Sequence, residues 1–191
     1  MKGNSFLIKG LQVATLSWIA ATGTGADAAE FTNAYTTINL ERCTQVESAD
    51  EEGTFGGSWN CPGYGGFDVL VAEGDLRMFV SFGPDAGHEP AARQTLPRFN
   101  TINETLEWRL RDGVPFATIL RWFPSLDDGR KTGSVLIVTQ LKPGSICQIG
   151  RVDAQVNPGA NQMSRDLADT MAGTYDCSVP PMVLGNKGIL D

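Results

Sequence analysis

The sequence predicts an α+β domain in which a mainly antiparallel sheet of six or seven strands carries one C-terminal helix and two disulfides. Three observations indicate this fold class. Four runs rich in β-branched and aromatic residues follow one another over residues 105–152, separated by Asp-Gly, Asp-Asp-Gly and Pro-Gly turns. Apolar residues then recur at helical spacing. Four cysteines form an even set.

The four runs are expected to form an antiparallel meander. They span residues 105–111, 114–123, 134–141 and 146–152. The second run and residues 135–138 are apolar on both faces, which is typical of central strands that are covered on both sides. The helix can cover one face. The other face needs the N-terminal strands, or the sheet must curl toward a barrel.

The Asp-Gly pair at residues 112–113 predicts a two-residue hairpin turn between the first two runs. This turn would place Arg111 opposite Val114 and Arg109 opposite Phe116. The residues then expected on the other face of the hairpin are Leu106, Trp108, Leu110, Pro115, Ala117, Ile119 and Arg121.

Shorter strands are expected before the meander. Residues 35–42 alternate in polarity and predict the first strand, after a loose lead-in at residues 31–33. Residues 67–73 and 76–83 predict a second hairpin around the Gly-Asp pair at residues 74–75.

Three connecting stretches separate these strands. The acidic stretch 44–60 lacks the ligand spacing of a calcium loop and is expected to be a solvated loop. Within the glycine-rich stretch 56–66, Gly63-x-Gly65 precedes a strand instead of following one, and the third glycine of a dinucleotide fingerprint is absent, so that interpretation is rejected. Residues 84–103 form a long connection that contains the single histidine.

A helix is expected after the meander. Asn157 is a good N-cap, Pro158 suits the first helical position, and Gly173 suits the position after the C-cap. The apolar stripe consists of Ala160, Met163, Leu167, Ala168 and Met171. Core packing is a commoner role for such a stripe than lining a ligand groove.

The N-terminus has the pattern of a secretory signal peptide. Lys2 and Lys9 precede a short apolar core at residues 11–21, and Ala-Asp-Ala at residues 26–28 fits the cleavage rule. The apolar core is too short to span a membrane comfortably. We therefore expect a cleaved signal peptide at 1–28, a single α+β domain at 29–177 and a flexible C-terminal tail at 178–191. The protein should be periplasmic or secreted, with no integral membrane segment after cleavage.

The charge balance bears on partners. The formal net charge is −7, and residues 1–28 carry a net +1, so the processed chain would be near −8. This argues against nucleic-acid binding, which needs clustered basic residues. It is compatible with a cationic partner in the cell envelope, although acidity also serves ordinary solubility.

An oxidising compartment makes the cysteines informative. Cys43–Cys61 and Cys147–Cys177 are the preferred pairs because each closes a local loop, while two other pairings remain open. The sequence has no Cys-x-x-Cys and only one histidine, so neither a zinc site nor any other metal or cofactor is expected.

Four residues are candidates for binding. Trp59 and Tyr64 either pack around a disulfide or form contact anchors on a constrained loop. Arg77, expected opposite Ala72, could orient a ligand or be a paired surface residue. His88 is either simply exposed or part of a catalytic set, but no nucleophile motif accompanies it, so no catalytic residue is assigned.

Several stretches carry a family resemblance, namely GGSWNCPGYGG, EGDLR, TLEWR, GVPFATILRWF and CQIGRVDAQVNPGAN. Together they resemble a family of uncharacterised small exported proteins of Gram-negative alphaproteobacteria, over roughly residues 35–177. The resemblance implies a periplasmic setting. The family brings no activity and no assigned site residues.

Three functional hypotheses remain. The first is a non-catalytic periplasmic binding or accessory protein with an envelope protein as partner. The second is an inhibitor of a cationic wall-degrading enzyme such as lysozyme, by analogy of fold and charge alone. The third is an enzyme whose polar groups Glu107, Arg109, Arg111 and Arg121 converge in a cleft. The sequence leaves the oligomeric state open.

Overall fold

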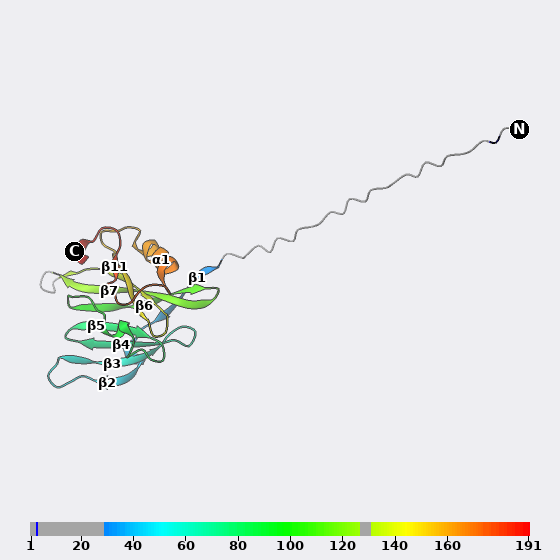
Figure 1. The fold of residues 1–191 in the computed structure, drawn as a ribbon. Coiled ribbons are helices and arrows are strands. Elements are labelled where there is room, and N and C mark those ends of the chain that lie inside the picture. Colours follow the sequence, from blue (N-terminus) through cyan, green and yellow to red (C-terminus); the bar gives the residue numbers. More distant parts are fainter. Residues whose placement is uncertain (1–2, 4–28, 127–130) are drawn as a thin grey trace.

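The computed structural model describes residues 3, 29–126 and 131–191. The predicted signal peptide at 1–28 thus lies, apart from residue 3, outside the described residues. Three layers lie on one another (Figure 1): the helix α1 (Ala160–Met171), a seven-stranded sheet, here called sheet A, and a four-stranded sheet, here called sheet B. The predicted α+β class is confirmed.

Sheet A contains the predicted meander. Its strand order is β1-β6-β7-β9-β10-β11, and β8 pairs with the end of β7. Every pair is antiparallel except β10 with β11. The bounds are β1 (Phe31–Thr37), β6 (Asn100–Arg111), β7 (Val114–Leu126), β8 (Lys131–Thr132), β9 (Val135–Gln140), β10 (Cys147–Asp153) and β11 (Met182–Val183).

Sheet B is antiparallel throughout, in the order β2-β3-β4-β5. Its strands are β2 (Thr44–Ser48), β3 (Phe55–Pro62), β4 (Asp68–Gly74) and β5 (Arg77–Phe82). The outer edge of β5 is covered, because the Met78 N–H donates to Asn100 Oδ1 at 3.1 Å and the Met78 carbonyl accepts from Thr95 Oγ1 at 2.7 Å. The described residues also include the short 3-10 helices η1 (Leu40–Arg42), η2 (Pro90–Arg93) and η4 (Gly188–Leu190).

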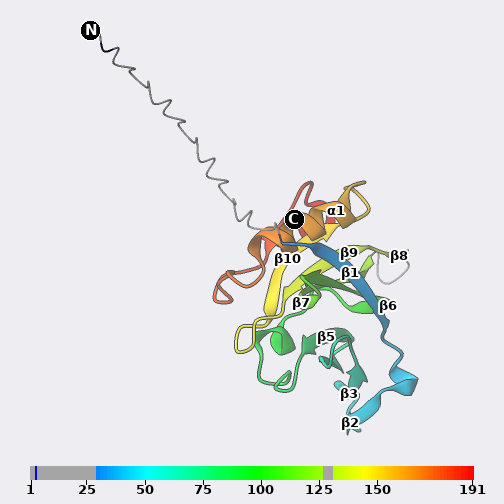
Figure 2. The ribbon, with the colours of Figure 1, turned by 90° about the vertical axis from the view of Figure 1, so that its right-hand side faces the viewer.

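Two hydrophobic cores hold the layers together. Trp108 is fully buried between the sheets, where its ring lies 5.7 Å from that of Phe82 and its Nε1 donates to Thr36 Oγ1 at 2.8 Å. The second core lies between sheet A and α1 and includes Val138 and Leu167. The central strands β7 and β9 are therefore covered on both faces, as predicted (Figure 2). The N-terminal strands supply the second cover, and the sheets do not close into a barrel.

The first hairpin has the predicted turn but a different register. Both turn residues at 112–113 have positive φ angles, +52° and +79°. Arg109, however, pairs with Ala117 and not with Phe116, because a bulge adds one residue to β7. A one-residue shift moves side chains to the opposite face of a sheet. Ala117 and Ile119 consequently lie in the core beneath α1, which corrects the predicted face.

The N-terminal elements also differ from the prediction. The proposed lead-in at residues 31–33 belongs to β1, and the chain leaves the strand after Thr37 to form η1. The acidic stretch, predicted to be a loop, forms the hairpin of β2 and β3. The Asp50 carboxylate closes this hairpin by accepting from the N–H groups of Thr54 at 2.8 Å and Phe55 at 3.1 Å.

The second predicted hairpin exists, with its turn displaced by one residue. The turn residues are Asp75 and Leu76, with φ angles of +51° and +58°. Arg77 therefore pairs with Gly74 instead of Ala72. The Glu73 carboxylate accepts from the Leu76 N–H at 2.8 Å. This hydrogen bond stabilises the turn although neither of its two central residues is a glycine.

Helix α1 begins later than predicted, at Ala160, with Gly159 as its N-cap. Asn157 serves a different purpose. Its amide donates to the carbonyls of Asp153 at 2.8 Å and Asn186 at 2.7 Å. Gly173 follows the C-cap with a φ angle of +91°, as predicted.

The C-terminal segment 178–191, expected to be a flexible tail, packs on the domain instead. Met182–Val183 forms β11 against β10, and the Ile189 N–H donates to Asp153 Oδ2 at 2.9 Å. Ile189 and Leu190 pack against the core between the sheets. Backbone pairing with β10 and apolar contacts with the core between the sheets thus hold the segment in place.

Both preferred disulfides are present. Cys43–Cys61 joins the start of sheet B to β3, and Cys147–Cys177 joins β10 to the segment after α1, with Cα–Cα distances of 4.5 and 5.8 Å. Within the described ranges no helix has the length and apolarity needed to cross a membrane.

Candidate functional site

Trp59 and Tyr64 lie against the core between the sheets. Both are partly buried, and the Tyr64 ring centroid lies 6.4 Å from that of Trp108. Trp59 stands on β3, where a Cβ on Gly57 would lie 3.2 Å from its ring. This placement corresponds to the packing alternative and offers the two aromatic side chains little free surface.

Arg77 is the first residue of β5, and His88 lies beyond the other end of that strand. Arg77 forms an ion pair with Asp75, donates from Nε to the Pro97 carbonyl at 3.2 Å, and lies 5.4 Å over the Phe99 ring. It is thus a paired residue of the hairpin end. The structure does not bring Arg77, His88 and the two aromatic residues into one site.

His88 lines an open hollow of about 330 Å³ on the outer face of sheet B. Its Nδ1 lies 2.8 Å from Asp85 Oδ1, and the two side chains are 83% and 75% exposed. Asp68 and Asn60 are the other hydrogen-bonding side chains of the hollow. A histidine–aspartate pair activates a hydroxyl or a thiol, and the lining residues include neither.

The negative charge of the protein is concentrated on sheet B and the segments that flank it. Residues 38–89 contain ten Asp and Glu residues but only two Arg residues, whereas the remaining residues of 29–191 sum to no net charge. This range comprises η1, all four strands of sheet B and the connection to His88. One side of the domain therefore attracts cations, while the side that carries α1 is close to neutral.

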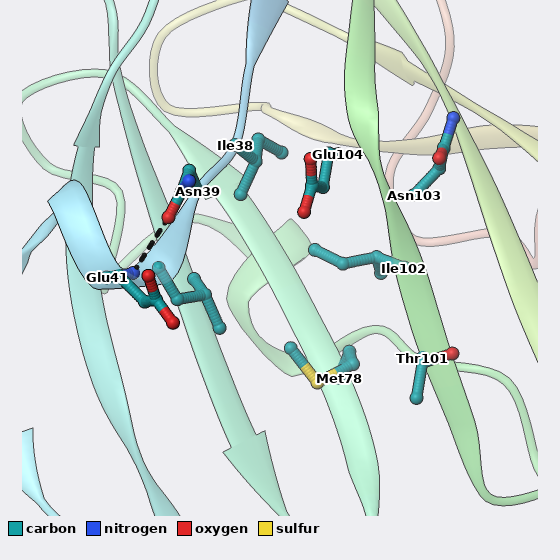
Figure 3. A pocket seen from close by; sticks show the side chains of 9 residues that line it. Ile38, Asn39, Glu41, Met78, Thr101, Ile102, Asn103 and Glu104 are labelled. Atoms are coloured by element: carbon teal, nitrogen blue, oxygen red, sulfur yellow. Dashed lines mark hydrogen bonds between the residues drawn. The ribbon is translucent and has the colours of Figure 1, made fainter.

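A cleft of about 430 Å³ lies where sheet B meets sheet A. It is formed by η1 and its preceding residues, by Met78 of β5 and by residues 101–104 of β6 (Figure 3). Ile38 and Met78 are buried, and with Leu40 and Ile102 they make up the apolar part of the lining. The cleft is positioned by the hydrogen bond from the Ile38 N–H to the Glu104 carbonyl, 2.7 Å long.

Two carboxylates give this cleft its chemical character. Glu41 and Glu104 are exposed at its lining, one on η1 and the other on β6 (Figure 3). Neither carboxylate has a hydrogen bond or an ion pair with any other residue that the structure describes. No lysine, arginine or histidine lines the cleft. An apolar lining beside two unpaired carboxylates suits a group with an aliphatic stem and a cationic head.

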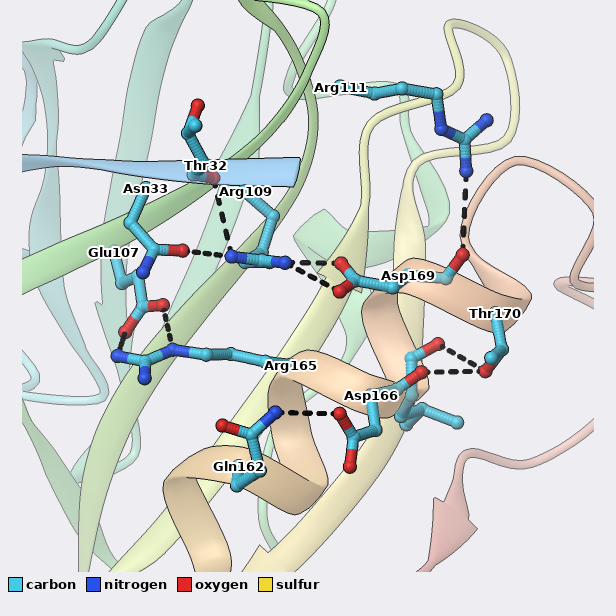
Figure 4. A network of polar contacts seen from close by, with 11 residues as sticks. Thr32, Asn33, Glu107, Arg109, Arg111, Gln162, Arg165, Asp166, Asp169 and Thr170 are labelled. Carbon is cyan, nitrogen blue, oxygen red and sulfur yellow. Dashed lines mark hydrogen bonds and ion pairs between the residues drawn. The ribbon is translucent and has the colours of Figure 1, made fainter. Parts of the chain in front are cut away.

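The polar residues of β6 that could have formed a catalytic cleft are instead paired with α1 (Figure 4). Arg109 contacts Asp169 through two nitrogens, at 3.0 and 2.5 Å, and Arg165 contacts Glu107 at 2.6 and 3.1 Å. The hydrogen bond with the Glu107 carboxylate raises the pKa of Arg165 above its usual value. These two ion pairs fasten the helix to sheet A.

Arg111 also reaches α1, because its Nη2 donates to the Asp169 carbonyl at 3.5 Å (Figure 4). The Arg111 guanidinium lies 4.8 Å from the centroid of the Phe116 ring, the residue at the bulge. Arg121 donates to the Ser134 hydroxyl and, at 3.4 Å, to Asn161 Oδ1. All four residues thus have partners within the domain, and none of them lines either of the two hollows described above.

Among the residues that the structure describes, no three His, Cys, Asp or Glu side chains are grouped so that they could hold a metal ion. No family model, curated protein or solved structure matches the chain. The class of protein that the fold and the cleft define is thus a disulfide-linked α+β protein with one acidic sheet.

The acidic cleft was not predicted from the sequence because its residues come from three separate segments, and the only signal was the run of acids after residue 40.

Proposed function

We propose that this protein is a non-catalytic binding protein of the cell envelope, and that its partner is a cationic protein bound at sheet B. The observation that carries the proposal is the pair of unpaired carboxylates, Glu41 and Glu104, beside an apolar cleft in the acidic half of the domain. A lysine or arginine side chain of a partner could lay its stem on Met78 and place its charge between the carboxylates. The surrounding acidic sheet would speed the encounter.

The envelope location rests on three supports. Two disulfides are typical of an oxidising compartment. The N-terminal pattern is that of a secretory signal peptide. The resemblance to exported alphaproteobacterial proteins agrees with a periplasmic setting, while secretion beyond the cell remains the alternative.

A second candidate is a narrower form of the first, an inhibitor of a cationic wall-degrading enzyme such as lysozyme. The concentration of the whole net charge on residues 38–89 favours it, because a basic enzyme would meet a single acidic surface. An assay of wall lysis by lysozyme tests it directly. Slower lysis at micromolar protein would support inhibition, and unchanged lysis would remove this candidate.

A catalytic role has weaker support. His88 and Asp85 stand in an open hollow whose lining lacks a nucleophile, and the arginines of β6 are paired with other groups. Binding requires only the surface charge and the apolar cleft that are present.

Affinity capture from envelope extract tests the proposal. A double alanine change of Trp59 and Tyr64 would damage the core, so the informative variant is Glu41→Gln with Glu104→Gln. The matched control is Asp166→Asn with Asp191→Asn, which removes the same charge from exposed positions on other elements. We expect a basic partner to be retained by the wild type and by the control and to be lost from the cleft variant. Equal retention by all three proteins would contradict the proposal.

A further inference from the structure

Strand β1 is an open edge of sheet A (Figure 2). The Asp112 N–H donates to the Glu30 carbonyl at 2.9 Å, and the Ile38 N–H donates to the Glu104 carbonyl at 2.7 Å. Bonded residues alternate along an antiparallel ladder, so the even-numbered residues of β1 bond to β6. The backbone groups of the odd-numbered residues point outward, and in the described part of the chain they have no backbone partner. These residues are Phe31, Asn33, Tyr35 and Thr37.

The other strand edges of the described chain are protected and β1 is not. Strand β2 carries Glu47, has an irregular register and leads into further acidic residues. Strands β8 and β11 have two residues each, and β5 is covered through Thr95 and Asn100. Strand β1 has seven residues, no charge, no proline and an unbroken register with β6. Natural proteins seldom leave such an edge exposed unless something pairs with it.

The side chains of this edge are exposed and held in position. Phe31 and Tyr35 are 39% and 55% exposed and lie on the same face of the strand. The Arg111 guanidinium lies 5.3 Å from the centroid of the Phe31 ring, and Arg165 Nη2 donates to the Tyr35 hydroxyl at 3.3 Å. Arg109 donates to Asn33 Oδ1 (Figure 4). Such preorganisation lowers the entropy lost when a partner binds.

We propose that β1 pairs antiparallel with β1 of a second copy of this chain, around a two-fold axis that passes by Asn33. In this register Phe31 of each copy faces Tyr35 of the other, and each outward N–H and carbonyl finds a partner. Cross-strand aromatic pairs stabilise antiparallel strands, and the pairing brings no charged residues of β1 together. A second copy fits because the strand is self-complementary and because the repelling charge lies on residues 38–89, outside β1.

Sedimentation velocity over a micromolar to submillimolar range tests the dimer, with the protein expressed from the full sequence and purified as the cell processes it. The informative variant is Tyr35→Lys, which places one positive charge on each of the two β1 strands that pair in the dimer. Val46→Lys is the matched control, because Val46 is 59% exposed on the edge strand β2 and the charge change is the same. Asn33→Asp is a second variant that keeps an acceptor for Arg109 and puts two carboxylates beside the axis.

We expect the wild type and Val46→Lys to dimerise alike. Tyr35→Lys should raise the dimer dissociation constant by about tenfold for each copy of the substitution. Asn33→Asp should weaken the dimer in the same direction, and the thermal midpoints of the monomers should stay similar. A wild type that is monomeric throughout the range, or a dimer that resists both β1 variants, would overturn the proposal.

Discussion

The Arg109 guanidinium and the Asp169 carboxylate form a bidentate ion pair that connects β6 to α1. The two contacts measure 3.0 and 2.5 Å, and the side chains are 6% and 21% exposed. Because Arg109 is buried, its charge depends on this carboxylate for compensation. The helix is thereby fixed over β7 and β9, whose apolar residues it covers.

Removing the Asp169 charge should destabilise the fold strongly. Asp169→Asn leaves the Arg109 guanidinium buried without its counter-charge, and we expect a loss of about 3–5 kcal/mol in the free energy of unfolding. Urea denaturation measures the loss. Asp166→Asn on the same helix is the control, since Asp166 is exposed and its change should stay within about 0.5 kcal/mol. Equal midpoints for the two variants would contradict this account of the ion pair.

The two disulfides should differ slightly in their effect on stability. They close loops with sequence separations of 18 and 30 residues, for which chain entropy gives about 3 and 3.5 kcal/mol. Cys147→Ala with Cys177→Ala should therefore cost somewhat more than Cys43→Ala with Cys61→Ala, as measured by urea denaturation. Peptide mapping without reduction should recover Cys43–Cys61 and Cys147–Cys177. Recovery of crossed peptides would refute the pairing.

Gly57 should resist substitution. Its φ angle is +126°, and an added Cβ would lie 3.0 Å from the Glu47 carbonyl oxygen and 3.2 Å from the Trp59 ring. We expect Gly57→Ala to lower the free energy of unfolding by about 1–3 kcal/mol because both backbone strain and crowding oppose it. Gly159→Ala should be nearly neutral, since its φ is −92° and nothing lies within 4 Å. Thermal unfolding of the two variants side by side decides the point.

Asp50 should make the fold sensitive to acid. The hydrogen bond from the Thr54 hydroxyl, followed by that from the Phe55 N–H, lowers the pKa of Asp50 below its ordinary 3.8. A lowered folded-state pKa stabilises the fold fully above the ordinary value, and this contribution disappears as the pH falls through the folded-state pKa. Thr54→Val should raise the pKa of Asp50 toward the ordinary value, as NMR titration of the carboxylate would show. The pKa of Asp176, which the Ser178 backbone N–H lowers, should stay unchanged as an internal control.

The strands of the meander, the helix and the disulfides were predictable because each carries a local signal. Turn dipeptides and β-branched runs mark β6, β7, β9 and β10, and helical spacing marks α1. The bulge at Phe116 has no such signal, because nothing local distinguishes that residue from its neighbours. Strand β3 was not predicted because Gly56 and Gly57 have low strand propensity and weaken the strand pattern. In the folded chain, pairing with β4 outweighs that low propensity.

The candidate site was less predictable than the fold. Trp59 and Tyr64 stood out by residue type, yet their partial burial against the core between the sheets depends on how two sheets pack and not on any short motif. The cleft joins residues 38–41, Met78 and residues 101–104, which only the folded chain brings together. The charge of residues 38–89 was visible in the sequence, but its meaning required knowing that they build one sheet.

An NMR titration of the labelled protein with a short lysine peptide, such as trilysine, tests directly whether the acidic cleft binds cations. We expect the amide shifts to concentrate at residues 38–41, at Met78 and at residues 101–104, and the binding to weaken as salt screens the charges. Glu41→Gln with Glu104→Gln should raise the dissociation constant by about tenfold, about 1.4 kcal/mol, whereas Asp166→Asn with Asp191→Asn should leave it nearly unchanged. Shifts that centre elsewhere, or an affinity that is the same in both double variants, would contradict the claim that this cleft binds cationic partners.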